Sequence, residues 1–181
     1  MNDLALSIRA ARPEDAADLA RIYIDSWHDT YAGVISHEML GAMTLERHTA
    51  RWKSVIKAGG TVLVAQDAQH GAIGLTSLGG ARDKSLGYDG EVYTLYVDPA
   101  FLGRGCGRAL MTGAFQVFKN SKMGSCLIWA HARNNACFFY EAMGGRRVAT
   151  RTTRLMGELT PEIGFGWHQL ATSKQVRTLP F

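Results

Sequence analysis

Residues 93–110 decide the fold, and they read YTLYVDPAFLGRGCGRAL. The first five are aromatic, β-branched or aliphatic and predict a strand, which Asp98-Pro99 ends. Three glycines at alternate positions then predict a tight turn, and the apolar spacing after them predicts a helix over residues 109–119. Glycine lets a backbone approach a ligand closely, and the first N–H groups of a helix lack partners within it. This strand, turn and helix therefore predict an anion site suited to a pyrophosphate.

Two common phosphate-binding motifs do not match the turn. A P-loop ends in Gly-Lys-Ser or Gly-Lys-Thr, whereas Gly107 is followed here by Arg108-Ala109. The dinucleotide fingerprint GxGxxG fails as well, because its last position is not glycine whether it is counted from Gly103 or from Gly105. A nucleotide-binding module is therefore disfavoured.

The rest of the chain alternates strands and helices. Apolar alternation predicts strands over residues 4–8, 61–66, 72–78, 91–97, 125–131, 147–155 and 162–170. Helical spacing predicts further helices over residues 12–27, 36–57 and 135–143, the second interrupted near residues 41–44. The order is strand, helices, three strands, helix, strand, helix and two strands, which predicts an α/β (α+β) fold with a mixed sheet.

The composition predicts one globular unit. The chain has 181 residues, of which 46% are hydrophobic and 20% charged, and no linker or repeat divides it. We expect a single domain over residues 1–181 with a polar tail over residues 171–181. No apolar run approaches the ~20 residues that a spanning helix needs, and the N-terminus lacks the pattern of a signal peptide. We therefore expect a cytoplasmic protein without a membrane partner.

Positive charge is concentrated toward the C-terminus. The 20 basic and 16 acidic residues leave a net charge of +4, all of which arises after residue 131. So mild an excess is weak evidence for nucleic acid, suits a small polyanionic ligand equally well, and is also compatible with an ordinary solvated surface. The three cysteines form no CxxC pair and the six histidines have no metal-ligand spacing, so we expect free thiols and no metal.

Residues 102–107 resemble the signature Gln/Arg-x-x-Gly-x-Gly/Ala of the GNAT superfamily of acetyl-CoA-dependent N-acetyltransferases, which follows a strand ending in Val-x-Pro. They read LGRGCG, so Leu102 stands where the signature has Gln or Arg; one polar anchor is lost and the backbone donors remain. Two further blocks are similar to the same family, residues 134–145 (NNACFFYEAMGG) and residues 26–33 (SWHDTYAG). The resemblance covers about residues 6–170, which form the recognisable core.

The resemblance implies a fold and an activity. The fold is a mixed, mostly antiparallel, splayed central sheet of about 6–7 strands flanked by about 4 helices. The activity is transfer of an acetyl group from acetyl-CoA to a primary amine of a small molecule or peptide, directly, in a ternary complex. The alternative is a CoA-binding regulatory or structural domain without catalysis. Amino acids, polyamines, antibiotics, xenobiotic amines and protein amines stay open as acceptors, as does O-acetylation, and a homodimer is frequent in the family.

Two residues are candidates for proton transfer, because amide formation from a thioester needs a neutral amine and a protonated leaving thiol. Glu91 begins the central strand, where the resemblance implies a general base that acts through water; with regular alternation it shares a face with Tyr93, Leu95 and Val97. Tyr140 matches the family tyrosine near the coenzyme sulfur, and a phenol of pKa ~10 can donate to a thiolate whose acid has a pKa of ~8.5. The alternatives are a solvated carboxylate at Glu91 and a core aromatic at Tyr140.

The resemblance also implies which segments hold the coenzyme. The pantetheine arm pairs with the strand backbone at Leu95, Tyr96 and Val97, where the neighbouring strand splays away, and the Val97 N–H stabilises the thioester carbonyl. Asn134 anchors the arm or, alternatively, only caps the helix that follows it. The turn contributes Leu102, Gly103, Arg104, Gly105, Cys106, Gly107 and Arg108.

Four further side chains are candidates either for the wall of the acceptor pocket or for the core: Trp27, Tyr31, Trp129 and His131. Cys106 is a nucleophile in principle, but a small residue that fills the turn is the simpler interpretation.

Overall fold

The computed structural model describes residues 4–31, 36–155 and 158–170. Within these ranges seven strands form one sheet: β1 (Leu6–Ala10), β2 (Thr61–Asp67), β3 (Gly71–Gly80), β4 (Gly90–Val97), β5 (Cys126–His131), β6 (Arg146–Leu155) and β7 (Glu158–Trp167). The same ranges contain five α-helices: α1 (Ala16–Tyr31), α2 (His37–Gly41), α3 (Leu45–Lys57), α4 (Cys106–Asn120) and α5 (Ala136–Ala142). Two short 3-10 helices, η1 (Pro13–Asp15) and η2 (Pro99–Phe101), precede α1 and the glycine turn.

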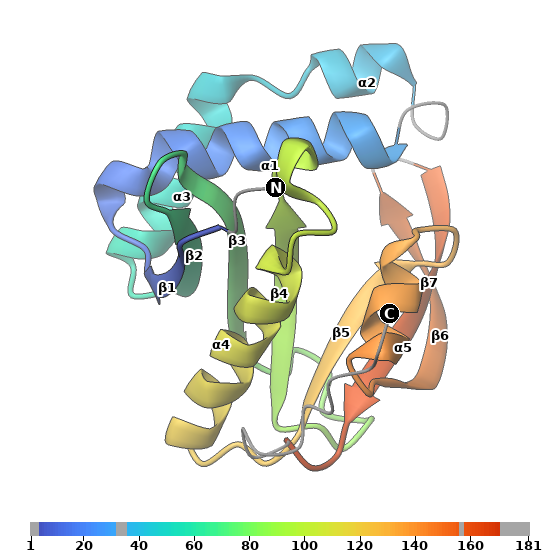
Figure 1. The fold of residues 1–181 in the computed structure, drawn as a ribbon. Coiled ribbons are helices and arrows are strands. Elements are labelled where there is room, and N and C mark those ends of the chain that lie inside the picture. The colour runs from blue at the N-terminus through green and yellow to red at the C-terminus, as the bar shows by residue number, and fades with distance from the viewer. Residues whose placement is uncertain (1–3, 32–35, 156–157, 171–181) are drawn as a thin grey trace.

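The strand order in the sheet is β1-β2-β3-β4-β5-β7-β6 (Figure 1). β4 and β5 run parallel, and the other neighbouring strands that the structure describes are antiparallel. The predicted mixed, mostly antiparallel sheet is therefore confirmed. The predicted interruption near residues 41–44 separates α2 from α3, because the Thr44 side chain accepts the N–H of Arg47 and so begins a new helix.

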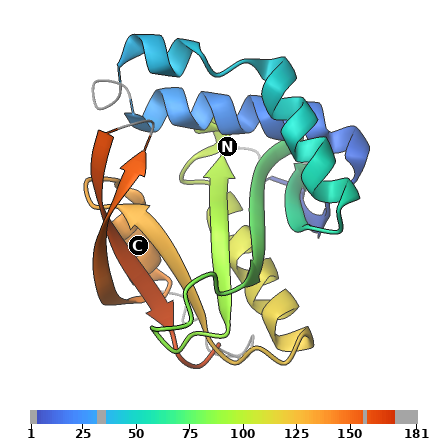
Figure 2. The same cartoon turned by 180° about the vertical axis from the view of Figure 1, so that it is seen from behind.

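β4 and β5 are paired only at their first residues. Gly90–Val92 pairs with Cys126–Ile128, and no β5 partner is recorded for the described β4 residues beyond Val92. On its other side β4 stays paired with β3 as far as Val97. Beyond the short ladder the two strands diverge toward α1 (Figure 2). The sheet is therefore splayed between β4 and β5, which confirms the expected splay.

A β-bulge interrupts β4 just where the splay begins. Val92 is opposite Leu78 and Thr94 is opposite Ser77, so Tyr93 is the extra residue. Val92 and Val97 lie in the core beneath α4, and Leu95 packs against the same core, although Val92 and Leu95 are three residues apart. The expectation that Glu91 shares a face with Leu95 and Val97 was therefore wrong, because the bulge reverses the alternation between them.

Helices cover both faces of the sheet (Figures 1 and 2). On one face α4 packs on β1–β4 and α5 packs on β5–β7, over a core that includes Phe118 and Phe165. On the other face α1 packs on β3 and β4 and α3 packs on α1, with Trp52 buried against the strands. Among the helices described, none has the length and apolar character of a membrane span.

Candidate active site

A cavity of about 530 Å³ lies where β4 and β5 diverge. Its walls come from three parts of the chain. The end of α1 contributes Ser26, Asp29 and Thr30. The last residues of β4 and the segment after them contribute Leu95, Tyr96, Val97, Pro99, Leu102 and Gly103. The segment after β5 contributes Arg133, Asn134, Asn135, Ala136, Phe139 and Tyr140.

The glycine turn between η2 and α4 has a backbone conformation that residues with a side chain rarely adopt. Gly103 and Gly105 have φ angles of +73° and +85°, which glycine adopts without strain. Gly105 is the N-cap of α4, and no side chain caps the helix there, so its first N–H groups lack a side-chain acceptor. Gly107 has a different reason to be small, because a Cβ there would lie 3.3 Å from the Cζ of Phe139 in the cavity wall. The turn therefore has the geometry of an anion site.

The structure brings part of the predicted coenzyme site to this cavity, namely Leu95, Tyr96, Val97, Leu102, Gly103, Asn134 and Tyr140. The remaining predicted residues are not among its lining: Arg104, Gly105, Cys106, Gly107 and Arg108. These five form the rest of the turn and the first residues of α4. The guanidinium of Arg104 lies 5.5 Å from the ring centroid of Phe101.

Cys106 points into the core and not into the cavity. It is buried, and its Sγ lies 3.9 Å from the carbonyl oxygen of Ile73. Burial, with a smaller contribution from Asp98, raises the pKa of the thiol to about 12. Cys106 is therefore uncharged at neutral pH, which favours its interpretation as a small core residue over that of a nucleophile.

Tyr140 lies on α5 and is buried except where it meets the cavity. Its ring contacts those of Phe139, Phe165 and Trp167, with centroid distances of 5.3, 5.5 and 6.5 Å. Burial in these apolar surroundings raises the pKa of the phenol. Tyr140 therefore keeps its proton through the neutral pH range.

Asn134 connects the start of α5 to the end of α1. Its Oδ1 accepts the N–H of Ala136 at 2.8 Å, so the capping role is present. Its side chain also lies near the hydroxyl of Tyr31 at the end of α1, where it opposes the rise in the pKa of that phenol that burial causes. Asn134 thus both caps the helix and lines the cavity.

Glu91 does not line the cavity. Its side chain is 2% exposed, and both of its carboxylate oxygens are occupied by Arg82. Oε2 accepts the backbone N–H of Arg82 at 2.9 Å, and Oε1 accepts from Nε at 3.0 Å and from Nη2. Because these donors already use the carboxylate, the geometry disfavours the expected role of Glu91 as a general base.

None of the four candidate pocket residues lines the cavity. Trp27 is buried beside Leu40, and its Nε1 donates to the Tyr96 hydroxyl at 3.0 Å, which makes it a core residue. Tyr31 lies between Trp27 and His131, with centroid distances of 4.8 and 5.9 Å.

His131 and Trp129 face away from α4 and α5. The Nδ1 of His131 accepts the N–H of Arg133 at 3.0 Å, so the neutral ring carries its proton on Nε2. Burial, helped by Arg133, lowers the pKa of His131 and keeps it neutral. Trp129 lies under the guanidinium of Arg151, 4.0 Å from its ring centroid. His131 therefore offers a donor and not a base.

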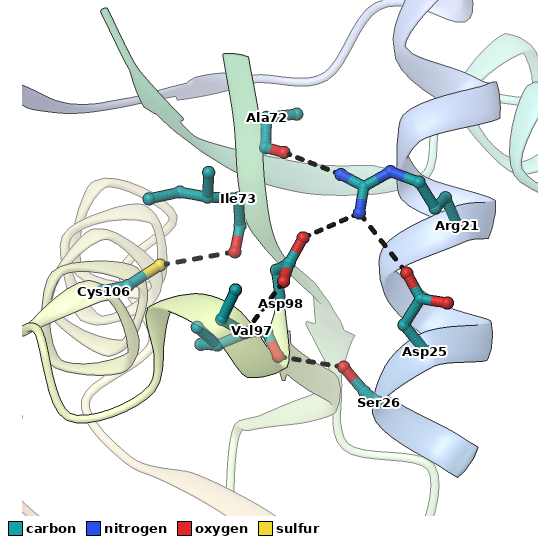
Figure 3. Close-up of polar contacts among 9 residues, drawn as sticks. Arg21, Asp25, Ser26, Ala72, Ile73, Val97, Asp98 and Cys106 are labelled. Atoms are coloured by element: carbon teal, nitrogen blue, oxygen red, sulfur yellow. Dashed lines mark hydrogen bonds and ion pairs between the residues drawn. The ribbon is translucent and has the colours of Figure 1, made fainter. Parts of the chain in front are cut away.

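The end of α1 is tied to the end of β4 (Figure 3). Ser26 donates its hydroxyl to the carbonyl of Val97 at 3.0 Å, and both residues line the cavity. Arg21 reaches Asp98 at 2.7 Å and the carbonyl of Ala72 at 3.3 Å. Asp98 also accepts the N–H of Ala100 and so caps η2. These contacts fix α1 at the rim of the cavity.

Sequence reasoning missed the part of α1 that lines the cavity. Ser26, Asp29 and Thr30 belong to the block that resembles the family, but Trp27 and Tyr31 were the residues selected from it. Residues three and four apart share a face of a helix, so 26, 29 and 30 form one stripe and 27 and 31 form the next. The periodicity indicates two stripes, and only the tertiary structure indicates which of them meets the cavity.

Known proteins resemble this chain over most of its length. The acetyltransferase (GNAT) domain family matches residues 58–144. The uncharacterized N-acetyltransferase YuaI of Bacillus subtilis is 32% identical over 169 residues, which cover 93% of this chain and 96% of that relative. A GCN5-related N-acetyltransferase from Rhodopseudomonas palustris has a TM-score of 0.69 at 23% identity, with 92% and 96% of the two chains covered. The structure of yncA from Salmonella typhimurium, solved with acetyl-CoA, has a TM-score of 0.67 at 20% identity, with 97% and 99% covered.

The splayed sheet, the glycine turn and the cavity between β4 and β5 define an acyltransferase. Together with these similarities they confirm the family inferred from residues 102–107, and the chain belongs to the GNAT family of N-acetyltransferases.

Proposed function

We propose that the protein transfers the acetyl group of acetyl-CoA to a primary amine of a small molecule or peptide, directly, in a ternary complex. One observation carries the proposal: Tyr140, whose hydroxyl is protonated, lines the same cavity as the β4 residues that β5 leaves unpaired. When bound, acetyl-CoA supplies a thioester, and in the overall reaction a C–N bond replaces its C–S bond while the amine loses a proton and the sulfur gains one.

The residues of the cavity fit this coenzyme. The N–H groups at the start of α4, just after Gly103 and Gly105, suit its phosphates, and Arg133 adds a positive charge at the rim. Asp98 donates its N–H to Ile73 in β3, so strand alternation directs the N–H of Val97 to the opposite edge, toward the opening. A strand edge without a partner suits the amides of the pantetheine arm, and the Val97 N–H suits the thioester carbonyl.

Tyr140 has the properties of the proton donor to the departing sulfur, because burial keeps it protonated and the residue lines the cavity. Glu91 and His131 are poorly placed to take the proton of the amine, for the reasons given above. We assign Glu91 to bracing Arg82 and the loop before β4. The acceptor then reacts as its free base and releases its proton to water.

Binding and turnover test the proposal together. Calorimetry should show that acetyl-CoA binds while ATP and NAD do not, and release of free thiol should follow when amines are screened. Tight NAD binding would contradict the proposal that the cavity binds acetyl-CoA. Acetyl-CoA binding without thiol release for any amine would instead support the alternative, a CoA-binding domain without catalysis.

Direct transfer has its own test. Intact-mass analysis of the protein after incubation with acetyl-CoA alone should show no added acetyl group, because the buried Cys106 thiol is uncharged at neutral pH. A stoichiometric acetyl-protein that decays when amine is added would overturn the ternary complex. A homodimer stays a prediction of the family resemblance, which light scattering tests.

A further inference from the structure

A second cavity, of about 330 Å³, lies on the face of the sheet that α1 and α3 cover. It is bounded by Tyr23 of α1, by His48, Arg51 and Trp52 of α3, and by the β3–β4 region around the bulge. Tyr93 and Thr94 line this second cavity, whereas the next three residues of β4 line the first one. The two cavities therefore flank consecutive residues of one strand, at the point where β4 and β5 part.

This placement brings the second cavity next to the site of transfer. Pairing between β4 and β5 stops at Val92, one residue before the bulge at Tyr93. Beyond that point β4 and β5 diverge toward α1 (Figure 2). A small molecule held over Tyr93 and Thr94 therefore lies one residue along β4 from the backbone that lines the first cavity together with Tyr140.

The second cavity is positively charged. Arg51 and Arg82 line it, and no Asp or Glu is among the described residues that do so. Arg82 is balanced by Glu91, but no ion pair described in the structure involves Arg51, whose charge acts on the neutral hydroxyl of Tyr23 and lowers its pKa against the larger effect of burial. Arg51 therefore contributes a charge that no neighbouring carboxylate cancels.

The other titratable groups of the second cavity are neutral. Burial, together with Arg51 and Arg47, lowers the pKa of His48. Burial raises the pKa of Tyr23 and of Tyr93. These groups offer hydrogen bonds without charge, so the positive potential of Arg51 is left intact.

Part of the remaining wall is aromatic. The ring of Tyr23 lies 5.0 Å from that of His48 and 6.2 Å from that of Trp52, between ring centroids. The guanidinium of Arg82 lies 4.9 Å from the ring centroid of Tyr93. An apolar body fits against these rings, while a planar guanidinium suits a carboxylate.

We propose that the second cavity is the acceptor site and that it selects a small amine with an apolar body and a carboxylate, which Arg51 binds. This inference rests on the proposed acetyl transfer and narrows its acceptors. It excludes polyamines as preferred acceptors, because they bring positive charge to Arg51. It also places the acceptor in the second cavity and not in a pocket walled by the four side chains that the sequence suggested, Trp27, Tyr31, Trp129 and His131.

Matched acceptors test the selection. L-Phenylalanine and 2-phenylethylamine, L-leucine and isopentylamine, and L-methionine and 3-(methylthio)propylamine differ within each pair by one carboxylate. In at least one pair, kcat/KM should be about tenfold or more higher for the amino acid, and spermidine should be poorer than that amino acid. If no pair shows the preference, or if spermidine is the best acceptor, the inference is overturned.

Variants locate the effect. Arg51→Gln should lower kcat/KM for the preferred amino acid by about 10- to 100-fold and change that of its decarboxylated partner by less than about threefold. Arg51→Lys should restore part of the loss, because it keeps the charge without the planar fork. Lys53→Gln removes the same charge from the same helix but is not part of the cavity wall, so both acceptors should be unaffected. Equal losses for both acceptors in Arg51→Gln would overturn the inference while leaving acetyl transfer intact.

A binding measurement separates this inference from the activity. N-acetyl-L-phenylalanine, titrated calorimetrically into protein with CoA, should bind to the unaltered protein and to Lys53→Gln but at least tenfold more weakly to Arg51→Gln. If this dependence holds while no amine is acetylated, the anion site stands and the proposed acetyl transfer fails. If amines are acetylated while binding is independent of Arg51, acetyl transfer stands and the anion site fails.

Discussion

The hydroxyl of Tyr140 combines two properties that a proton donor needs. It belongs to the cavity wall, and burial raises its pKa so that the proton is present throughout the neutral range. The ring itself is held by Phe165 and Trp167, so its position does not depend on the hydroxyl. Removal of the oxygen alone is therefore a clean test of its chemistry.

We predict that Tyr140→Phe lowers kcat by about 100-fold or more, the lower end of what a positioned acid contributes. The Kd for acetyl-CoA should change by less than about threefold, because the ring contacts remain. Steady-state rates and calorimetry measure the two quantities. Phe138→Leu on the same helix is the control, since Phe138 is 69% exposed and is not part of the cavity wall. Unchanged turnover with collapsed affinity would contradict the acid role.

Glu91 makes the opposite case, a buried carboxylate whose partners are structural. Glu91→Gln removes the charge opposite Arg82, and we expect a loss of about 1–3 kcal/mol in the free energy of unfolding, measured with urea. The acidic limb of the pH–rate profile should persist and should move with the pKa of the acceptor amine when acceptors are exchanged. Loss of that limb in the variant would restore Glu91 as the base.

At the scale of elements, the contacts between α1 and β4 control the rim of the cavity. Asp98 pairs with Arg21 and caps η2, which leads directly into the glycine turn. Asp25 also approaches Arg21, but at 3.4 Å and with a side chain that is 48% exposed, against 12% for Asp98. The two aspartates share one partner and differ in burial and geometry, so they form a matched pair.

We predict that Asp98→Ala lowers the free energy of unfolding by about 1–3 kcal/mol, through loss of the cap and of the ion pair. It should also weaken acetyl-CoA binding severalfold, because η2 positions the turn. Asp25→Ala should change stability by less than about 0.5 kcal/mol, as exposed pairs do. Thermal unfolding and calorimetry check both variants. Equal effects at the two positions would show that the cap and the turn are not linked.

The features that could be predicted from the sequence are local ones. The strand, the glycine turn and the helix of residues 93–110 depend on neighbours in the chain, and so does the cap at Thr44. The bulge at Tyr93 depends on pairing with β3, and the contact of Glu91 with Arg82 depends on how the loop between β3 and β4 folds back. Neither the bulge nor this contact produces a periodic pattern in the sequence. The face of Glu91 was therefore beyond the reach of alternation, and its contact with Arg82 is the reason why the role of general base, which the resemblance implied, is not the role that we propose.

For the whole molecule, acid should be the condition that destabilises the fold. Hydrogen bonds from Arg9 lower the pKa of Asp15, and His70 and Ser125 do the same for Asp67 and Asp89. A carboxyl whose folded pKa is lowered contributes stability above its unfolded pKa of about 3.9. That contribution is lost as the pH falls through the lower folded value. Stability should therefore decline below about pH 4.

We predict that Asp15→Asn lowers the free energy of unfolding at pH 7 by about 1 kcal/mol, since the carboxylate also accepts the N–H of Arg12. The difference from the unaltered protein should shrink toward zero as the pH falls through the lowered folded pKa of Asp15, below which the carboxyl is protonated in both states. Urea titrations at a series of pH values measure this convergence. A difference that stays constant with pH would mean that the charge of Asp15 does not stabilise the fold.

The short ladder between β4 and β5 joins the two halves of the sheet at one end and leaves them apart at the other. Three residue pairs form this ladder, and beside it Phe115 of α4 packs on Trp167 of β7 at 5.4 Å between ring centroids. At the far end α1 bridges the diverging ends of the two strands, held to β4 by the hydrogen bond of Ser26 and in contact with the end of β5 through the rings of Tyr31 and His131. The separation of the diverging ends of β4 and β5 is therefore set by α1. A ligand that contacts both ends adds a further link between two halves of the sheet that are otherwise joined by the ladder and by α1. Amide hydrogens of β5 and β7 near α1 should consequently exchange faster than those near the ladder between β4 and β5. Bound acetyl-CoA should slow the exchange of these faster amides.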